Sequence, residues 1–310
     1  MTTVTYDDVT AAAARISGHV LRTPVIEVAP RLWLKLEQLQ HSGSFKVRGA
    51  FNRIMSAGDL PAAGVIAASG GNHGLAVAFA ARALGVRAEI FVPTVTSPVK
   101  VAGLERLGAR ITQTGAIYAE AAEAAAKRAA ETGALSVHAY DQPEVVAGQG
   151  TAGLELIEQT GGVDTVLVAV GGGGFAAGVT LGTSVSGPRI VAVEPERIPT
   201  LNAALRAGER VQVEVGGVAA DALGASMIGG LAFEILSGPR VESVLVNDEA
   251  IVAARRTLWE RHRVAAEHAG AAAYAALLSG AYRPEPGERV AVVVCGANTD
   301  PATLVSGSQP

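Results

Sequence analysis

Four lysines are the candidate amine nucleophiles of this chain, and three of them have ordinary explanations. Lys35 lies in the alternating run 33–37, so we expect it on the solvated face of a strand. Lys100 lies in an amphipathic run, and Lys127 follows Glu123 by four residues on an Ala-rich helix, where an ion pair in water is ordinary. These three lysines therefore predict no chemistry.

Lys46 has a different setting. It stands between small hydroxyl and glycine residues and an apolar helical run that includes Phe51 and Ile54, and no carboxylate lies within four positions on either side. This setting favours a lysine with a lowered pKa that reacts with a carbonyl carbon. A lysine that begins a helix and extends its amine into solvent explains the local sequence equally well.

Two glycine-rich stretches each follow an expected strand and precede an expected helix. Residues 69–74, Ser-Gly-Gly-Asn-His-Gly, can turn backbone N–H groups toward an anion, although a tight turn is the more ordinary interpretation of this spacing. Residues 171–174 are four glycines that open a helix, where the helix dipole also favours an anion. With Ala176 and Glu194 they satisfy a dinucleotide-binding fingerprint as well, so the second stretch is ambiguous.

The cysteine and histidine contents argue against two other kinds of site. The single cysteine, Cys295, rules out an internal disulfide framework, and at the end of a strand it is usually a small buried hydrophobe. The six histidines are scattered, and no metal cluster of standard spacing is present. We therefore expect no bound metal.

The stretch around Lys46 resembles the lysine motif of the serine/threonine dehydratase (threonine ammonia-lyase) family of fold-type II pyridoxal-phosphate enzymes. In that family a Glu is followed by a Thr or Ser and then by Gly-Ser-Phe-Lys-x-Arg-Gly-Ala. Here Glu37, Ser42 and residues 43–50 match the motif, and further matches recur in family order as far as Asn298. The resemblance therefore covers nearly the whole chain.

The resemblance implies a role for each motif. Lys46 would be the catalytic residue, the Schiff-base lysine that holds the cofactor aldehyde and later removes the α-proton of the substrate. Residues 170–178 match the phosphate cradle of pyridoxal phosphate, and His73 is implied to have no catalytic role. The implied cofactor-binding residues are Phe45, Lys46, Asn72, Gly171, Gly172, Gly173, Gly174 and Cys295. The implied substrate-binding residues are Ser69, Gly70, Gly71, Asn72 and His73.

The activity that the resemblance implies is β-elimination from a small hydroxy amino acid by a pyridoxal 5'-phosphate-dependent dehydratase (ammonia-lyase). L-threonine would give 2-oxobutyrate and L-serine pyruvate, each with ammonia. Serine racemisation is an alternative, but racemases carry a serine immediately after the first serine of the asparagine loop, where this chain has Gly70. Departures beside the expected pocket, at Leu75, Ala297 and His268, keep 3-hydroxyaspartate open as a substrate. A nicotinamide-dependent oxidoreductase is a distant alternative that rests only on the spacing of residues 171–176.

The elements that must position these residues alternate between strands and helices. Strand-like runs at residues 64–68, 87–92 and 109–112 each precede a helical run, and a second set follows in the C-terminal half. Such alternation predicts an α/β fold with parallel sheets covered by helices on both faces. The resemblance implies two open twisted sheet domains of the tryptophan-synthase-β-like kind, fold type II. The large cofactor-binding domain would comprise residues 1–46 and 142–310, and the small inserted α/β domain, with the substrate-carboxylate loop, residues 47–141.

The composition limits the partners of the chain. A length of 310 residues, 49% of them hydrophobic, supports a sizeable core, and a net charge of −4 gives no reason to expect nucleic acid or an anionic membrane. The first eight residues are polar and acidic, unlike a signal peptide, and no apolar run reaches the roughly 18 residues of a membrane span. We therefore expect a cytoplasmic protein that acts on a small molecule, and the resemblance implies a homodimer.

Overall fold

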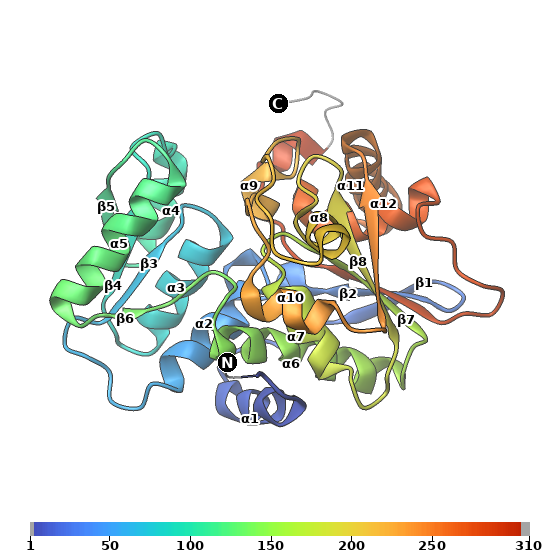
Figure 1. Cartoon of the computed structure of the whole chain (residues 1–310), viewed down its shortest axis with the longest axis horizontal. Coiled ribbons are helices and arrows are strands. Elements are labelled where there is room, and N and C mark those ends of the chain that lie inside the picture. The colour runs from blue at the N-terminus through green and yellow to red at the C-terminus, as the bar shows by residue number, and fades with distance from the viewer. Residues whose placement is uncertain (1–2, 305–310) are drawn as a thin grey trace.

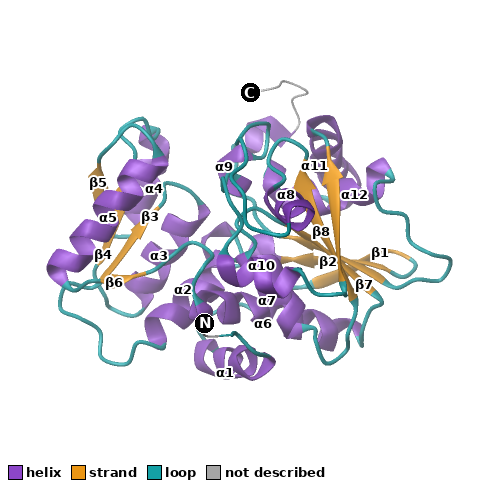
Figure 2. Cartoon of the chain, viewed as in Figure 1, coloured by secondary structure: helices purple, strands orange, loops and turns teal. Residues whose placement is uncertain are grey.

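Two separate β-sheets organise the chain, as Figures 1 and 2 show. The computed structural model describes residues 3–304. The larger sheet has the strand order β1-β2-β10-β7-β8-β9, and its neighbouring strands are parallel except for β1 with β2. The smaller sheet has the order β5-β4-β3-β6 and is wholly parallel. The strands of the larger sheet are β1 (Val25–Ala29), β2 (Leu32–Leu36), β7 (Thr165–Ala169), β8 (Arg189–Pro195), β9 (Val241–Val246) and β10 (Val290–Val294), and those of the smaller are β3 (Val65–Ala68), β4 (Ala88–Val92), β5 (Arg110–Gln113) and β6 (Leu135–Ser136).

Helices cover both faces of the sheets (Figure 2). The helices in the first half of the chain are α1 (Tyr6–Ile16), α2 (Lys46–Met55), α3 (Asn72–Ala83), α4 (Pro98–Arg106), α5 (Tyr118–Thr132) and α6 (Pro143–Thr160). Those in the second half are α7 (Gly174–Gly182), α8 (Thr200–Ala207), α9 (Ala220–Leu223), α10 (Gly230–Leu236), α11 (Asp248–His262) and α12 (His268–Ser279). The expected α/β fold is therefore confirmed. Within the described residues, no helix is both long and apolar enough to cross a membrane.

The centre of the larger sheet follows directly from its composition. Every residue of β7 and of β10 is buried; β10 consists of valine and alanine, and β7 of valine, leucine, alanine and one threonine, which is typical of parallel strands covered on both faces. Helix α12, which packs on β7, β8, β9 and β10, is half alanine, so its backbone lies close to the sheet. The ends of these strands are thereby held in a rigid core.

Helix α2 lies where the chain passes from the larger sheet to the smaller one. It packs against α6, beside the larger sheet, and against α3, beside the smaller sheet. The strands of the smaller sheet all lie between residues 65 and 136. The domain boundaries expected after residues 46 and 141 stay a prediction. Helices α8, α9 and α10 were not predicted from the sequence.

The expectation that Lys35 faces solvent is wrong. Lys35 is 0% exposed, because its strand β2 is an inner strand and α6 covers that face. Its amine donates to the Glu155 carboxylate at 2.7 Å and to the Thr23 carbonyl oxygen at 2.9 Å. Arg48, also 0% exposed, donates to Glu37 and to Glu155 at distances of 2.7–2.9 Å. A buried network of opposite charges therefore anchors α2 two residues after Lys46.

Candidate active site

Lys46 is the first residue of α2, and the turn before it is attached to the end of β10. The Phe45 N–H donates to the Cys295 carbonyl oxygen at 3.2 Å, and Ser44 forms an isolated antiparallel bridge with Gly296. The end of a central strand and the start of a buried helix thus fix the backbone of the lysine from both sides. A side chain held in this way has few orientations, which is what a reacting group needs.

The Lys46 amine has a lowered basicity. Burial lowers the pKa of Lys46 to about 8, although Cys295 and Glu267 nearby oppose the shift. The amine donates a hydrogen bond to the Ala139 carbonyl oxygen at 2.6 Å. A substantial fraction of the amine is therefore neutral near pH 8, in the form that acts as a nucleophile or a base.

The four glycines 171–174 form a cradle between the end of β7 and the start of α7. A Cβ atom at Gly172 would lie 2.4 Å from the Tyr140 ring, and one at Gly174 would lie 2.2 Å from the Tyr140 carbonyl oxygen. Gly173, with a φ of +85°, is the N-cap of α7. Only glycine fits such close approaches, and the four glycines line the same hollow as Lys46 at the start of α7, where helix N–H groups are free to bind an anion. This arrangement fits a phosphate group.

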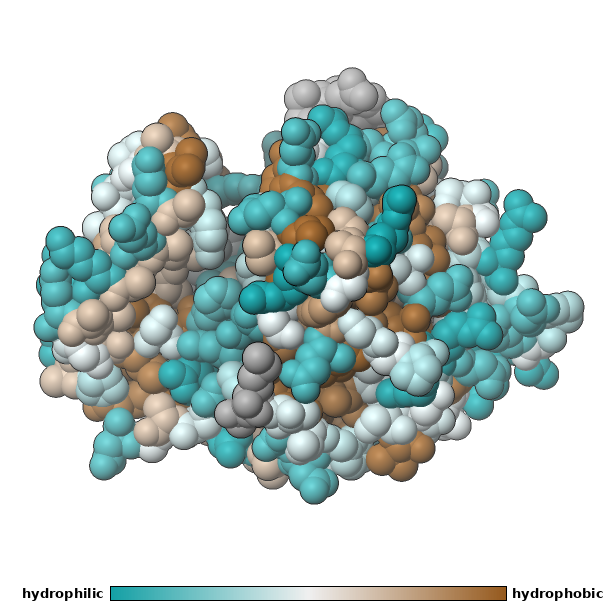
Figure 3. All heavy atoms as spheres, viewed as in Figure 1, coloured by the Kyte–Doolittle hydropathy of each residue, from teal (hydrophilic) through white to brown (hydrophobic). Residues whose placement is uncertain are grey.

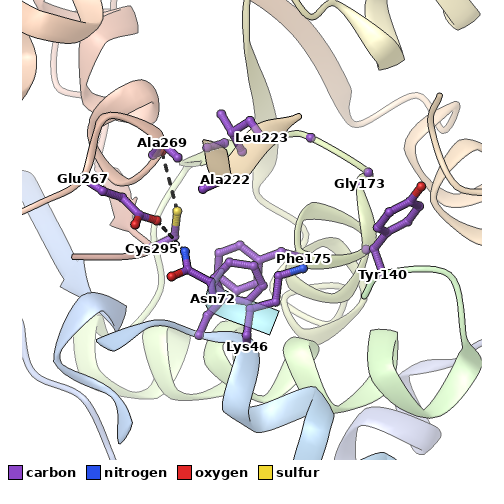
Figure 4. A pocket seen from close by; sticks show the side chains of 15 residues that line it. Lys46, Asn72, Tyr140, Gly173, Phe175, Ala222, Leu223, Glu267, Ala269 and Cys295 are labelled. Carbon is purple, nitrogen blue, oxygen red and sulfur yellow. Dashed lines mark hydrogen bonds between the residues drawn. The ribbon is translucent and has the colours of Figure 1, made fainter. Parts of the chain in front are cut away.

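The glycine cradle and Lys46 line one hollow, shown in Figure 4. The rings of Phe45 and Phe175 are stacked there, with centroids 3.9 Å apart and planes inclined by 18°. The structure brings together in this hollow all the residues that the resemblance assigned to cofactor binding: Phe45, Lys46, Asn72, Gly171, Gly172, Gly173, Gly174 and Cys295. Their roles as cofactor ligands stay a prediction.

A second hollow of about 590 Å³ opens from the first, with Lys46 and Asn72 in both. Its size is within the usual range of small-molecule sites. It is lined by segments that lie beside the two sheets. The space-filling view in Figure 3 shows a notch in the surface between the two parts of the molecule. The residues assigned to substrate binding, Ser69, Gly70, Gly71, Asn72 and His73, all line it. Lys100 of α4 and Asp221 of α9 also line it, and they form an ion pair across it.

The loop of residues 69–74 is closely folded. The Gly71 N–H donates to the Ser69 hydroxyl oxygen at 3.2 Å, and a Cβ atom at Gly74 would lie 2.0 Å from the Ser69 carbonyl oxygen. The loop therefore needs glycine at position 74, where α3 has begun. This fold leaves the Ser69 hydroxyl at the wall of the second hollow, where it can bind a polar group of a ligand.

Two titratable side chains of the site are held neutral. Burial, with the charge of Lys46, lowers the pKa of His73 to about 3, and the His73 ring nitrogen Nε2 lies 2.9 Å from the Val137 carbonyl oxygen. Burial raises the pKa of the Cys295 thiol far above its ordinary value, and its Sγ lies 3.7 Å from the Ala269 carbonyl oxygen. A neutral thiol is therefore the group that faces the hollow from the end of β10.

Sequence reasoning did not assign a role to two polar side chains that line the first hollow, Tyr140 and Glu267. Glu267 lies directly before α12, and its carboxylate accepts a hydrogen bond from Asn72 at 2.6 Å. Burial raises the pKa of Glu267 to about 7. An acid at the start of a helix is ordinary, and Tyr140 lies in a loop, so neither residue carried a local signal.

The carboxylate of Glu194 is committed to the start of α8. It accepts hydrogen bonds from the backbone N–H groups of Leu201 and Asn202 at 2.7 and 2.8 Å. The Thr200 hydroxyl lies 3.0 Å from the same carboxylate and 2.6 Å from the Gly171 carbonyl oxygen. Because Glu194 is 0% exposed and already bonded, it is not free to bind a ribose, which counts against the dinucleotide interpretation. Within residues 3–304, no group of three His, Cys, Asp or Glu is arranged to hold a metal ion.

Known proteins resemble this chain over nearly its whole length. A family model described as "Pyridoxal-phosphate dependent enzyme" matches residues 16–296. The L-threonine ammonia-lyase of Thermotoga maritima is 38% identical over 307 residues, which cover 96% of this chain and 76% of that protein. The beta-hydroxyaspartate dehydratase of Paracoccus denitrificans is 34% identical, with 96% of each chain covered. Among solved structures, maize serine racemase is 32% identical and superposes with a TM-score of 0.91 over 98% of this chain and 96% of that one.

Proposed function

Because the chain belongs to the pyridoxal-phosphate dependent enzyme family, we propose that it is a dehydratase (ammonia-lyase) that converts L-threonine, L-serine or both into 2-oxobutyrate or pyruvate and ammonia. Its fold is the fold type II of that family. The observation that carries the proposal is the position of Lys46, the one lysine that lines both hollows in the described part of the chain. An amine at this point can reach both a cofactor held by the glycine cradle and a substrate held by residues 69–74.

The residues present fit the cofactor. The glycine cradle would hold the phosphate, Asn72 and Cys295 would face the ring, and Lys46 would bind the aldehyde. When bound, pyridoxal phosphate supplies an electron sink for the bond broken at the substrate α-carbon. Cys295 is neutral and so does not hold a ring nitrogen protonated as a carboxylate does. The neutral thiol of Cys295 would in this way favour rapid loss of the β-hydroxyl, which is the chemistry of a dehydratase.

The chain supplies the remaining steps from its own groups. The lowered pKa of Lys46 gives a neutral amine that takes the α-proton, and the Ala139 carbonyl oxygen fixes the direction of that amine. The Ser69 hydroxyl and the backbone of its loop, which line the second hollow, would bind the substrate carboxylate. His73 is neutral and buried, so it adds no charge that would compete for this carboxylate.

Racemisation is disfavoured by Gly70, which lines the second hollow together with Lys46. It needs a second acid or base, and Gly70, at the place where racemases carry a serine, has no side chain to provide one. A Cβ atom at Gly70 would lie 3.0 Å from the Thr96 methyl group, so a serine there would also require Thr96 to move. We therefore expect D-amino acid to be a minor product.

The second candidate function is the dehydration of 3-hydroxyaspartate. Lys100 supports it, because its amine lines the second hollow and a substrate with a second carboxylate could replace Asp221 as its partner. Relatives of this kind are also found at 34% identity. L-threonine and L-serine have no second carboxylate for Lys100 to bind.

The test is direct. The purified protein, loaded with pyridoxal phosphate, is incubated separately with L-serine, L-threonine and threo-3-hydroxyaspartate, and both 2-oxo acid and D-amino acid are measured. We expect 2-oxo acid from L-threonine or L-serine, and none from the Lys46→Ala variant. D-serine without 2-oxo acid would overturn the dehydratase proposal, and 2-oxo acid from hydroxyaspartate alone would select the second candidate.

We also propose a cytoplasmic location and a homodimer, both from the family resemblance and from the amino-acid substrates that the relatives' names give. Light scattering on the purified protein tests the second point. A molecular mass near that of one chain would contradict it.

A further inference from the structure

Asn72 is held on both sides of its carboxamide by residues to which no role has been given above. Its Nδ2 donates to the Glu267 carboxylate at 2.6 Å, and its Oδ1 accepts from Asn298 Nδ2 at 2.6 Å. Asn298 Nδ2 also donates to the Ser42 carbonyl oxygen at 2.8 Å. The resulting network joins the start of α3, beside the smaller sheet, to the segments that flank α12 and β10 of the larger sheet. Figure 4 shows Asn72 and Glu267 facing each other at the side of the hollow next to Cys295.

The packing shows that space is reserved for this network. A Cβ atom at Gly296 would lie 2.3 Å from the Glu267 carboxylate and 3.3 Å from Asn72 Nδ2. One at Gly43, whose φ is +75°, would lie 2.6 Å from Asn298 Oδ1. Glycines on two different segments therefore leave room for the same set of side chains.

The hydrogen bonds also fix which way the Asn72 carboxamide points. The Ser42 carbonyl oxygen can only accept, so Asn298 must turn its Nδ2 toward it. That nitrogen then faces Asn72, which must present its oxygen to Asn298 and its nitrogen to Glu267. A flipped Asn72 would set two donors against each other on one side and two acceptors on the other.

We propose that Glu267 and Asn298 are positioning residues that hold the Asn72 carboxamide so that its remaining N–H donates into the cofactor hollow. Asn72 lines both hollows, and within residues 3–304 its second amide hydrogen has no protein acceptor. The group that Asn72 meets on the cofactor must then be an acceptor, as the oxygen of its ring hydroxyl is when deprotonated. This inference rests on the cofactor assigned above and does not depend on which amino acid is the substrate.

The test measures cofactor binding rather than turnover. Protein freed of cofactor is titrated with pyridoxal 5'-phosphate, and the dissociation constant and the visible absorption maximum are recorded for the wild type, N72A, N298A and the double variant. A hydrogen-bond donor lost from a binding site weakens binding about tenfold, so we expect N72A and N298A each to bind about tenfold less tightly, with a displaced maximum. The double variant should bind no less tightly than N72A, because Asn298 acts through Asn72.

Two further variants separate positioning from general damage. E267Q keeps an oxygen that accepts from Asn72, so we expect its affinity and spectrum to stay within about threefold of the wild type, whereas E267A should resemble N298A. N247A is the matched control, because Asn247 caps α11 through a side-chain hydrogen bond to Ala250 N–H and does not line either hollow. It should leave cofactor affinity unchanged.

Wild-type affinity in N298A, additive losses in the double variant, or an equal loss in N247A would each overturn the inference. Failure of the dehydratase proposal has a different signature. The protein would then release no 2-oxo acid from any of the three substrates, while the differences in cofactor binding among these variants would persist.

Discussion

Replacement of Lys35 by methionine should destabilise the protein strongly, although Lys35 lines neither hollow. Lys35 lies 2.7 Å from the Glu155 carboxylate and 3.8 Å from that of Glu37, and Arg48 pairs with the same two acids. The four side chains balance two positive against two negative charges, so Lys35→Met leaves one buried negative charge without a partner. Breaking a buried pair costs about 3–5 kcal/mol. Because the Glu155 side chain keeps 16% exposure and can recruit water, we expect the lower end, about 3 kcal/mol.

The assay is urea unfolding followed by tryptophan fluorescence, for which Trp33 on β2 is a nearby reporter. Lys127→Met, at an exposed position on α5, is the matched control and should change the free energy of unfolding by less than about 0.5 kcal/mol. The double variant Lys35→Met/Glu155→Gln restores charge balance, and its cost should fall about 1–2 kcal/mol below the sum of the single costs. Additive costs, or a Lys35→Met variant as stable as the Lys127→Met control, would refute the account of a charge-balanced network.

The pH dependence of the same variant has a definite sign. Burial alone would raise the pKa of Glu37, but the charge and hydrogen bonds of Arg48, with Lys35 and Thr23, hold it below the ordinary value. A carboxyl with a lowered pKa contributes stability above its unfolded pKa and loses it as the pH falls through its folded pKa. Without Lys35 part of that contribution is absent, so the stability gap between wild type and Lys35→Met should narrow as the pH falls below about 5. A gap that widens in acid would contradict this sign.

Three further predictions concern the site itself. If Lys46 has the proposed role, its neutral amine is the form that attacks the cofactor aldehyde, so the rate at which cofactor-free protein takes up pyridoxal phosphate should rise with pH and level off above about 8; a rate that falls between pH 7 and 8 would contradict this. Gly172→Ala should lose cofactor binding in a titration, because its Cβ would lie 2.4 Å from an aromatic ring, whereas Gly103→Ala, whose Cβ would lie 3.7 Å from its nearest neighbour, should bind normally. Thr200→Val removes the hydroxyl that links Glu194 to the glycine cradle, so we expect the dissociation constant of the cofactor to rise about fivefold to tenfold. An unchanged dissociation constant would show that the cradle does not need this hydroxyl to bind the cofactor.

The two glycine-rich loops of the site were predictable from the sequence because the local backbone geometry requires glycine at these positions. Gly74 and the glycines of residues 171–174 are required because a Cβ atom at any of these positions would lie about 2.0–3.0 Å from a neighbouring atom. A run of glycines after a strand already predicts that the backbone is closely approached there. The buried strands β7 and β10 were predictable for a similar reason, since uninterrupted apolar β-branched runs have few other uses. Tyr140 and Glu267 were not predictable in this way, because a loop tyrosine and a helix-start glutamate are ordinary wherever they occur.

The contrast between Lys35 and Lys46 shows what the local sequence lacked. Both amines are removed from solvent enough for burial to lower their pKa. Lys35, from an inner strand, has two carboxylates within 4 Å and a carbonyl oxygen besides, so it stays a cation in a balanced network. Lys46 has the Ala139 carbonyl oxygen as its hydrogen-bond acceptor, and Glu267, the acid that influences its pKa, is already bonded to Asn72. The alternation of polar and apolar residues along a strand cannot show which face of the strand a helix will cover. The spacing of residues along α2 cannot show which hydrogen bonds a distant acid makes. The lowered pKa of Lys46 therefore follows from its burial and from the absence, within the described residues, of a carboxylate bonded to its amine, and neither can be inferred from the residues next to it in the chain.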